Sequence, residues 1–231
     1  MRVLVTRPLE DANETAALLT ARGHEAVVAP LLRVNYHDGH ALHLEGVQAI
    51  LATSANGVRA LARRTSLRDF PVFAIGSQTA EAARAAGFAD VRDADGNAQT
   101  LSKAVIAWAS PKDGVLLHVA GAEAEGRLAE LLATAGFTVR SEILYDVPAV
   151  AEFPGAVRDR IAAGMLDAVL LFSARSSEAF AACMAKAGLS CEALTAVCIS
   201  EAAAKPLLAL AFREIRIAPR PNQASLLDCL G

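Results

Sequence analysis

Small polar residues follow several short apolar runs of this chain, and their hydroxyl, amide and backbone N–H groups could bind an anion. Residues 53–57 (Thr-Ser-Ala-Asn-Gly) follow one run and residues 76–79 (Gly-Ser-Gln-Thr) follow another. In an open parallel sheet such residues lie at the carboxyl ends of the strands, where the N termini of the next helices face a ligand. The pattern therefore predicts a site for carboxylate or phosphate oxygens. The candidate binding residues are Arg7, Ser54, Asn56, Gly76, Thr79, Ser173, Ser176 and Ser200.

A simpler role also suits some of these residues. Ser54, Thr79 and Ser176 could each be an ordinary N-cap of a helix. Capping accounts for any one of them, but it does not explain why every strand end is polar, since each end is next to a different strand. Both interpretations stay open at this point.

The two tyrosines, Tyr36 and Tyr145, fall where the chain could pass between two domains. A phenol is protonated at neutral pH and can donate a hydrogen bond to a departing oxygen. Packing at a hinge between domains is an equally good interpretation.

Other chemical motifs are missing or isolated. The chain has neither a GxGxxG loop nor a Walker loop, so we expect no nucleotide cofactor. His37, His40 and His43 lie in a glycine-containing segment with only Asp38 nearby, which predicts a solvated loop and no metal site. His118 lies in an apolar strand and is expected to pack in the core. The serines have no evident histidine and aspartate partners for a hydrolase triad.

The polar turns recur because the chain is an internal duplication. Residues 47–61 match residues 166–180 without a gap, and residues 73–83 match residues 197–207. A second unit, residues 3–28, resembles residues 115–139. The order of the repeats is A, B, A′, B′.

Two domain arrangements satisfy this order. The halves could lie in tandem, with a break near residues 110–114. Alternatively, a second domain could be inserted into the first, with crossings near residues 31–37 and 145–148. The repeat pattern does not choose between them.

Short apolar runs alternate with segments of helical periodicity. The runs have four to six residues, and the segments between them carry apolar residues at a period of 3.6, for example Ala17, Leu18 and Ala21. Alternation with short loops predicts an α/β fold in which helices cover both faces of parallel sheets. Left-handed glycines are expected to end four helices, at Gly23, Gly87, Gly136 and Gly188.

The composition suits two modest domains. The chain has 231 residues, of which 54% are hydrophobic and 20% are charged. The formal net charge of −3 and the pI near 6.0 exclude a basic nucleic-acid-binding surface, so local donors must hold any anionic ligand.

The remaining sequence features concern the cellular environment. Four cysteines without a CxxC motif predict reduced, buried thiols. No apolar run reaches the roughly 18 residues that a membrane span needs, and the first residues resemble a strand and not a signal peptide. We therefore expect a cytoplasmic protein with neither nucleic acid nor a membrane as its partner.

Together these motifs resemble those of the uroporphyrinogen-III synthase family. The resemblance covers essentially the whole chain, and the order and spacing of the motifs make it specific. It is carried by residues 3–8, 30–31, 53–59, 74–80, 144–147, 172–176 and 221–227.

The resemblance implies two similar flavodoxin-like lobes, each a parallel sheet flanked by helices, joined by two crossing segments. Lobe one would comprise residues 1–34 plus 149–231, and lobe two residues 38–144. The implied protein is a cofactor-free lyase of heme biosynthesis. It would close hydroxymethylbilane, a linear tetrapyrrole with eight carboxylates, into uroporphyrinogen III in a cleft between the lobes, with inversion of the last pyrrole ring and loss of water. A monomer is the default expectation, because the sequence has no evident coiled or amphipathic helix for a partner.

Individual residues carry over by motif. Tyr145 matches the family tyrosine proposed to assist departure of the hydroxyl. Thr79, Ser173 and Ser176 match the polar turns of the two lobes, and Arg7 and Ser54 are candidates for carboxylate contacts.

The chain also departs from the family pattern. Ala203 stands where many members have threonine, Ser200-Glu201 replaces a common Gly-Pro, and Ala120 stands where arginine is frequent. These departures support an alternative function, a non-catalytic two-lobed protein that binds or senses anions.

Overall fold

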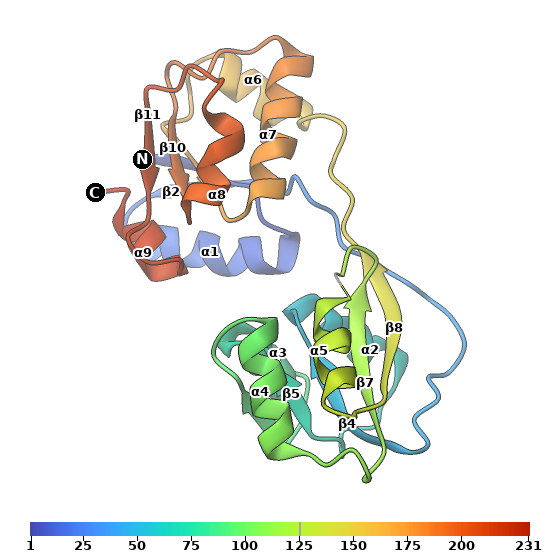
Figure 1. Cartoon of the computed structure of the whole chain (residues 1–231). Coiled ribbons are helices and arrows are strands. Elements are labelled where there is room, and N and C mark those ends of the chain that lie inside the picture. The colour runs from blue at the N-terminus through green and yellow to red at the C-terminus, as the bar shows by residue number, and fades with distance from the viewer. Residues whose placement is uncertain (125) are drawn as a thin grey trace. The chain divides into compact units, whose positions relative to one another are not determined.

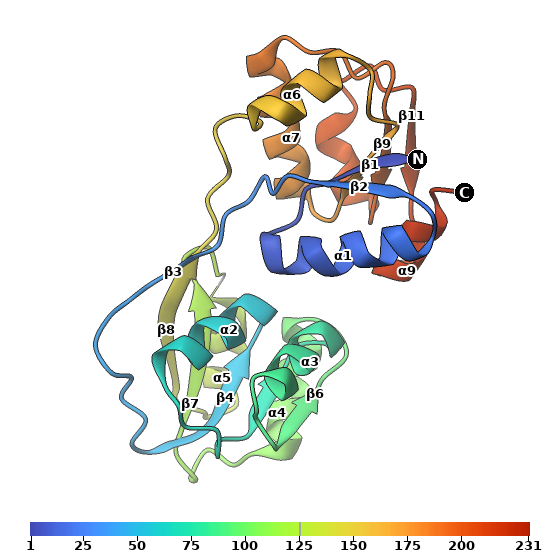
Figure 2. The same cartoon turned by 180° about the vertical axis from the view of Figure 1, so that it is seen from behind.

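A computed structural model describes residues 1–124 and 126–231 of the chain, which form two compact units. Unit one comprises Met1–Arg33 and Pro148–Gly231, and unit two comprises Val34–Val147. Figures 1 and 2 show the elements of each unit from opposite sides. Both units are α/β, in agreement with the prediction from the sequence.

Unit one is built around a parallel sheet with the strand order β11-β10-β9-β1-β2. Helices α1 and α9 cover one face and α6, α7 and α8 the other (Figure 1). The central strands are apolar along their whole length because both faces are covered. The strands are β1 (Arg2–Val5), β2 (Glu25–Val28), β9 (Ala168–Leu171), β10 (Thr195–Cys198) and β11 (Glu214–Ile217). The helices are α1 (Leu9–Ala21), α6 (Gly155–Ala162), α7 (Ala174–Ala187), α8 (Glu201–Ala204), the 3₁₀ helix η1 (Lys205–Leu207) and α9 (Gln223–Asp228).

Unit two has a sheet with the strand order β3-β8-β7-β4-β5-β6, in which only the β3–β8 pair of the described strands is antiparallel. Helices α4 and α5 pack on one face around Leu51 and Leu116, and α2 and α3 lie on the other. The strands are β3 (Asn35–Tyr36), β4 (Val47–Ala52), β5 (Val72–Ala74), β6 (Val91–Asp93), β7 (Val115–Gly121) and β8 (Val139–Asp146). The helices are α2 (Ala55–Arg64), α3 (Ser77–Ala85), α4 (Ala98–Trp108) and α5 (Arg127–Thr134).

The predicted helix ends are confirmed. Gly23, Gly87, Gly136 and Gly188 all have left-handed backbone angles, with φ between 62° and 94°. Only glycine adopts these angles without a steric penalty, so each residue stops its helix and turns the chain toward the next segment.

The buried face of α1 is not the one that carries the apolar residues Ala17, Leu18 and Ala21. The helix buries Ala12, Thr15 and Leu19, whereas Leu18 is 40% exposed. The helix is rich in alanine and leucine on more than one side, so apolar spacing alone does not fix which face packs. Thr15 is tolerated in the core because its hydroxyl hydrogen-bonds the Asp11 carbonyl at 2.9 Å and lies 3.1 Å from Gln223 Oε1.

The cysteines are unpaired. Cys183, Cys191 and Cys198 are buried, and Cys229 is half-buried. Burial raises the pKa of Cys191 to about 11 and that of Cys198 to about 12, so both thiols are protonated at neutral pH. Among the described helices, none combines the length and apolar character required to cross a lipid bilayer.

An ion pair joins the amino ends of two adjacent strands, and it predicts an acid-dependent contribution to stability. Arg2, in β1, donates from its backbone to Asp167 Oδ2 at 2.7 Å and from its guanidinium to Oδ1 at 3.0 Å. These hydrogen bonds lower the pKa of Asp167 to about 2. A carboxyl group with a lowered pKa stabilises the fold above its ordinary pKa near 4 and loses that effect as the pH falls toward 2.

Asp167→Asn should therefore destabilise the protein by about 1 kcal/mol at neutral pH, a value reduced for solvent screening because a third of the side chain is exposed. Urea unfolding of both proteins between pH 7 and pH 2.5 measures the difference, which should shrink as the pH falls below 4. A difference that stays constant over this range would show that the charge of Asp167 is not the cause.

Candidate functional site

The predicted binding residues lie where strands end and helices begin. Ser54 follows β4 and caps α2, and its Oγ accepts a hydrogen bond from Gly57 N–H at 3.0 Å. Gly76 follows β5 and is the N-cap of α3. In unit one, Ser173 follows β9 and caps α7, and Ser200 follows β10 and caps α8. Backbone N–H groups at the first turn of each helix have no partner within the helix and carry a partial positive charge, which suits an anion.

In unit two, the candidate residues Ser54 and Tyr145 are in direct contact. The Tyr145 hydroxyl lies 2.6 Å from Ser54 Oγ, and the tyrosine side chain is buried, with 8% exposure. Ser54 and Tyr145 are 91 residues apart in sequence. The fold brings them together because β4 and β8 both flank β7 and run in the same direction.

Tyr145 lies in β8 and Tyr36 lies opposite it in β3. Both residues therefore belong to the sheet of unit two, and the chain passes between units at Arg33–Val34 and at Val147–Pro148. The sequence placed the tyrosines in the crossing segments themselves. Strand pairing explains the difference, because β3 and β8 extend the sheet up to the last residues of unit two.

Thr79 is the third residue of α3 and is buried, with 5% exposure. The capping interpretation fails for this residue, because Gly76 is the N-cap and its carbonyl accepts a hydrogen bond from Thr79 N–H at 3.0 Å. A Cβ atom added to Gly76 would meet no atom within 4 Å, so the space beside this helix N terminus is open.

In unit one, Ser173 and Ser176 form a capping box at the start of α7. Ser173 Oγ accepts a hydrogen bond from Ser176 N–H at 3.1 Å, and Ser176 Oγ accepts one from Ser173 N–H, also at 3.1 Å. The two hydroxyl oxygens lie 3.2 Å apart. Capping is therefore a real role of Ser54 and Ser176, as the sequence allowed, although Ser176 is the partner within the box and not the N-cap. Ser200 Oγ accepts a hydrogen bond from Ala203 N–H at 3.3 Å.

Arg7 and Asn56 are engaged within their own units. The Arg7 guanidinium donates to Asp11 at 3.1 Å and to Gln223 at 2.5 Å, and it lies over the ring of Phe172. Its side chain is 10% exposed. The amide oxygen of Asn56 accepts a hydrogen bond from Arg59 at 2.9 Å. Arg7 thus holds the surrounding side chains in place at the carboxyl end of β1, next to α1.

The histidines form no metal site among the described residues, where no cluster of three or more histidine, cysteine or acidic side chains is placed to hold an ion. His37 lies 3.2 Å from Asp146, and His40 and His43 are exposed. His118 is buried, as expected, with Nε2 at 3.1 Å from Thr53 Oγ1. Burial lowers the pKa of His118, so its imidazole is neutral at pH 7.

Sequence reasoning missed Gly121, the last residue of β7. A Cβ atom added there would lie 2.8 Å from Cζ of Tyr145, closer than side-chain carbons approach. The register of β7 and β8 shifts between Ala120 and Gly121, so a β-bulge precedes the contact. A glycine at the end of an apolar strand is a signal of such close approach, although the sequence does not show which residue approaches.

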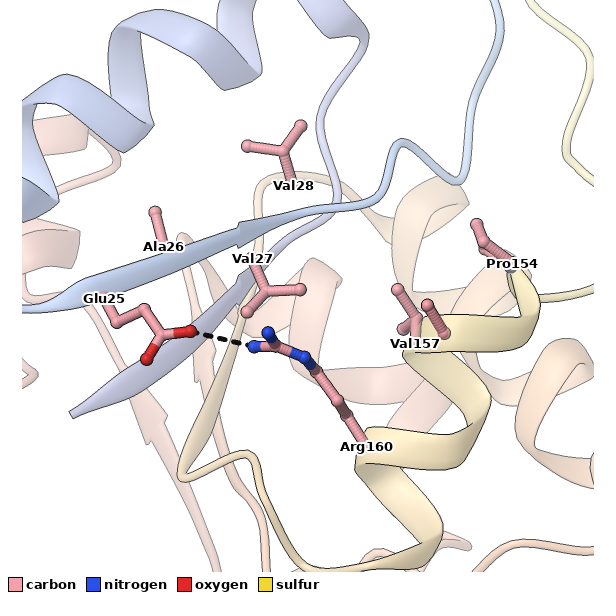
Figure 3. Close-up of a pocket in the computed structure, with 8 residues that line it drawn as sticks. Glu25, Ala26, Val27, Val28, Pro154, Val157 and Arg160 are labelled. Atoms are coloured by element: carbon pink, nitrogen blue, oxygen red, sulfur yellow. Dashed lines mark hydrogen bonds and ion pairs between the residues drawn. The ribbon is translucent and has the colours of Figure 1, made fainter.

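A pocket of about 330 Å³ lies elsewhere in unit one, between the edge strand β2 and helix α6 (Figure 3). Val27 and Val157 face each other across it, and Arg160 forms an ion pair with Glu25 at 2.8 Å. The charges of Arg160 and Glu25 neutralise each other, and none of the predicted binding residues lines the pocket. We assign this pocket no part in the candidate site.

The fold and the polar strand ends define a class of protein: an α/β protein of two units with mainly parallel sheets, in which serine or glycine caps the helices α2, α3, α7 and α8. The profile of the family described as uroporphyrinogen-III synthase HemD matches residues 13–228. The chain therefore belongs to the uroporphyrinogen-III synthase family.

Individual relatives are distant. Over 87 residues the chain is 31% identical to a Methanocaldococcus jannaschii protein that is provisionally named a uroporphyrinogen-III synthase, a match covering 35% of this chain and 36% of that protein. The chain thus spans about a third of that relative's length.

Two crystal structures share the fold. The uroporphyrinogen-III synthetase of Helicobacter pylori has a TM-score of 0.68 at 16% identity, with 100% of this chain and 98% of that chain covered. A mutant uroporphyrinogen III synthase of Thermus thermophilus has a TM-score of 0.53 at 19% identity, with 100% and 97% covered. At these identities the likeness concerns the fold.

Proposed function

We propose that this protein cyclises hydroxymethylbilane to uroporphyrinogen III, with inversion of the last pyrrole ring and loss of water. The observation that carries the proposal is the family match across residues 13–228. It makes the protein a lyase of porphyrin and heme biosynthesis.

Holding the substrate is the larger part of the task. Loss of the hydroxyl group generates an azafulvene that closes without inversion when it is free in solution. The protein must therefore fix the linear tetrapyrrole in one conformation, by proximity and by groups oriented in advance. The net charge of −3 provides no general attraction for eight carboxylates, so local N–H and hydroxyl donors must hold them.

The strand ends of each unit supply such donors. In unit two, we assign carboxylate contacts to the first turns of α2 and α3, with Asn56, Gly76 and Thr79. In unit one, we assign them to the first turns of α7 and α8, with Ser173, Ser176 and Ser200. Arg7, held by Asp11 and Gln223, supports the end of β1.

Tyr145 is assigned the chemical role. Its phenol donates a hydrogen bond to the departing hydroxyl group of the substrate, which leaves as water. The short contact with Ser54 and the low exposure of the ring support this role, because they fix the phenol in one place.

The unpaired cysteines fit a reducing compartment, so we place the protein in the cytoplasm. We take the two lobes to be residues 1–34 plus 149–231 and residues 38–144, and the working form to be a monomer that needs no cofactor.

The test is to supply hydroxymethylbilane and identify the isomer formed. The proposal expects uroporphyrinogen III at a rate well above spontaneous closure. Only the uninverted isomer, formed at the spontaneous rate, would overturn it.

The same experiment examines the alternative, a non-catalytic protein that binds tetrapyrrole carboxylates. Glu201 opens α8 and places a carboxylate where the unit-one contacts are assigned, and the buried Ala203 offers no hydroxyl. Binding of the porphyrinogen without turnover would favour this alternative.

A further inference from the structure

We propose that Ser54 is a positioning residue that holds the Tyr145 phenol by donating to its oxygen, so that the phenol proton is directed at the substrate. This inference rests on the proposed function and extends it to a residue otherwise assigned only to capping or to carboxylate contact. The observation is the 2.6 Å contact between Ser54 Oγ and Tyr145 Oη at the start of α2.

The direction of the hydrogen bonds follows from the chemistry of the step. Ser54 Oγ already accepts a hydrogen bond from Gly57 N–H. Its own proton can then be donated to Tyr145 Oη, which gives the series Gly57 N–H to Ser54 O–H to Tyr145. Hydrogen bonds in series polarise one another, and the first donor lies at the positive end of α2.

This series stabilises the charge that develops during the reaction. The carbon–oxygen bond of the substrate breaks with its electron pair on oxygen, the phenol proton passes to that oxygen, and water leaves. Negative charge then grows on Tyr145 Oη, and Ser54 donates to that atom. The phenolate recovers a proton when ring closure releases one.

Three contacts fix the tyrosine. The backbone carbonyl of Tyr145 accepts a hydrogen bond from Ala122 N–H at 2.9 Å. Its ring lies against Gly121, where a Cβ atom would come within 2.8 Å of Cζ. Its hydroxyl is held by Ser54. The position of the phenol oxygen is therefore set by β7, β8 and α2 together.

The corresponding serine in the duplicated copy in unit one shows which hydrogen bonds form when there is no tyrosine partner. In the gap-free match of residues 47–61 with residues 166–180, Ser54 corresponds to Ser173 and Gly57 to Ser176. In unit one, Ser176 Oγ lies 3.2 Å from Ser173 Oγ and completes a capping box. In unit two, Gly57 has no side chain to make this contact, and Ser54 binds Tyr145 instead.

The experiment measures kcat and KM for formation of the inverted isomer by the full-length protein. Ser54→Ala removes the cap and the donor to Tyr145, and Ser54→Thr retains both. Asn97→Ala is the matched control, because Asn97 is the N-cap of α4 in the same unit and lies outside the proposed site. We expect Ser54→Ala to lower kcat about tenfold with a smaller change in KM. Ser54→Thr should recover most of that loss, whereas Asn97→Ala should retain the kcat of the unmodified protein.

Gly121→Ala gives a second reading that leaves the cap of α2 in place. The added methyl group must displace the Tyr145 ring, so kcat should fall, and a thermal scan verifies that the variant is folded at the assay temperature. An unchanged kcat in this variant would overturn the inference. This variant keeps the proposal testable if Ser54→Ala is poorly folded.

A double-mutant cycle separates positioning from general stabilisation. In a Tyr145→Phe background, Ser54→Ala should produce no further loss of kcat, because the group that it positions is already absent. Additive losses, or equal kcat values for Ser54→Ala and Asn97→Ala, would overturn the inference. The proposed function fails separately, if the unmodified protein forms no inverted isomer.

Discussion

Tyr145→Phe is expected to lower kcat for formation of the inverted isomer by about 100-fold, the scale of one general acid. The substitution removes one hydroxyl group and leaves the ring against Gly121, so the packing of β7 and β8 is retained. Affinity for the product should fall much less, because the departing hydroxyl group is absent from the product. Steady-state kinetics and product titration measure the two quantities.

Tyr36→Phe is the control for this result. Tyr36 lies opposite Tyr145 in β3, and its ring packs against the Arg63 guanidinium at 4.3 Å. Loss of this second hydroxyl group should leave kcat unchanged. Equal losses of kcat and product affinity in Tyr145→Phe would instead assign Tyr145 to binding.

Gly57→Ala is expected to destabilise the protein by about 2 kcal/mol, although alanine ordinarily favours a helix over glycine. A Cβ atom at this position would lie 2.6 Å from the backbone carbonyl oxygen of Val119. A carbonyl within a strand cannot rotate away, so α2 must move off β7. Urea unfolding at pH 7 measures the change.

Gly155→Ala provides the contrast. Gly155 is also in the first turn of a helix, α6, and its Cβ would meet only the end of the Arg158 side chain, at 4.0 Å. This variant should be as stable as the unmodified protein or slightly more so. If Gly57→Ala behaved in the same way, the close packing of α2 on β7 would be wrong.

The sequence contains enough information to predict the α/β fold. Strands buried on both faces are short apolar runs, and the left-handed glycines Gly23 and Gly188 end helices where expected. The internal duplication strengthened the fold prediction further, because a turn that occurs twice at the same spacing supports it better than a turn that occurs once.

The face of α1 could not be predicted, because packing and not periodicity decides which side of an alanine-rich helix is buried. The hydroxyl of Thr15 is satisfied in the core by the Asp11 carbonyl of the preceding turn and also by Gln223, a residue far along the chain. Long-range partners of this kind leave no local signal.

The candidate residues were predictable by type but not by partner. Ser54 is followed by a helix, which its sequence context indicates. Its contact with Tyr145 depends on the register of β7 with both β4 and β8, including the bulge before Gly121. One-residue changes in register reverse the side-chain direction, so pairing between distant strands must be known before such a contact can be inferred.

The strand order of unit one has a consequence for the order in which the two units can fold during synthesis of the chain. β1 lies between β2 and β9, so it obtains its second neighbour only after residues 168–171 have been synthesised. Unit two is continuous from Val34 to Val147 and is therefore complete earlier. When unit two folds, Asn35 pairs with Asp146 and so joins the two ends of this unit. The loop between the two segments of unit one then becomes effectively shorter, which reduces the entropy cost of closing it. During translation, unit two thus brings together the two chain segments from which unit one is assembled.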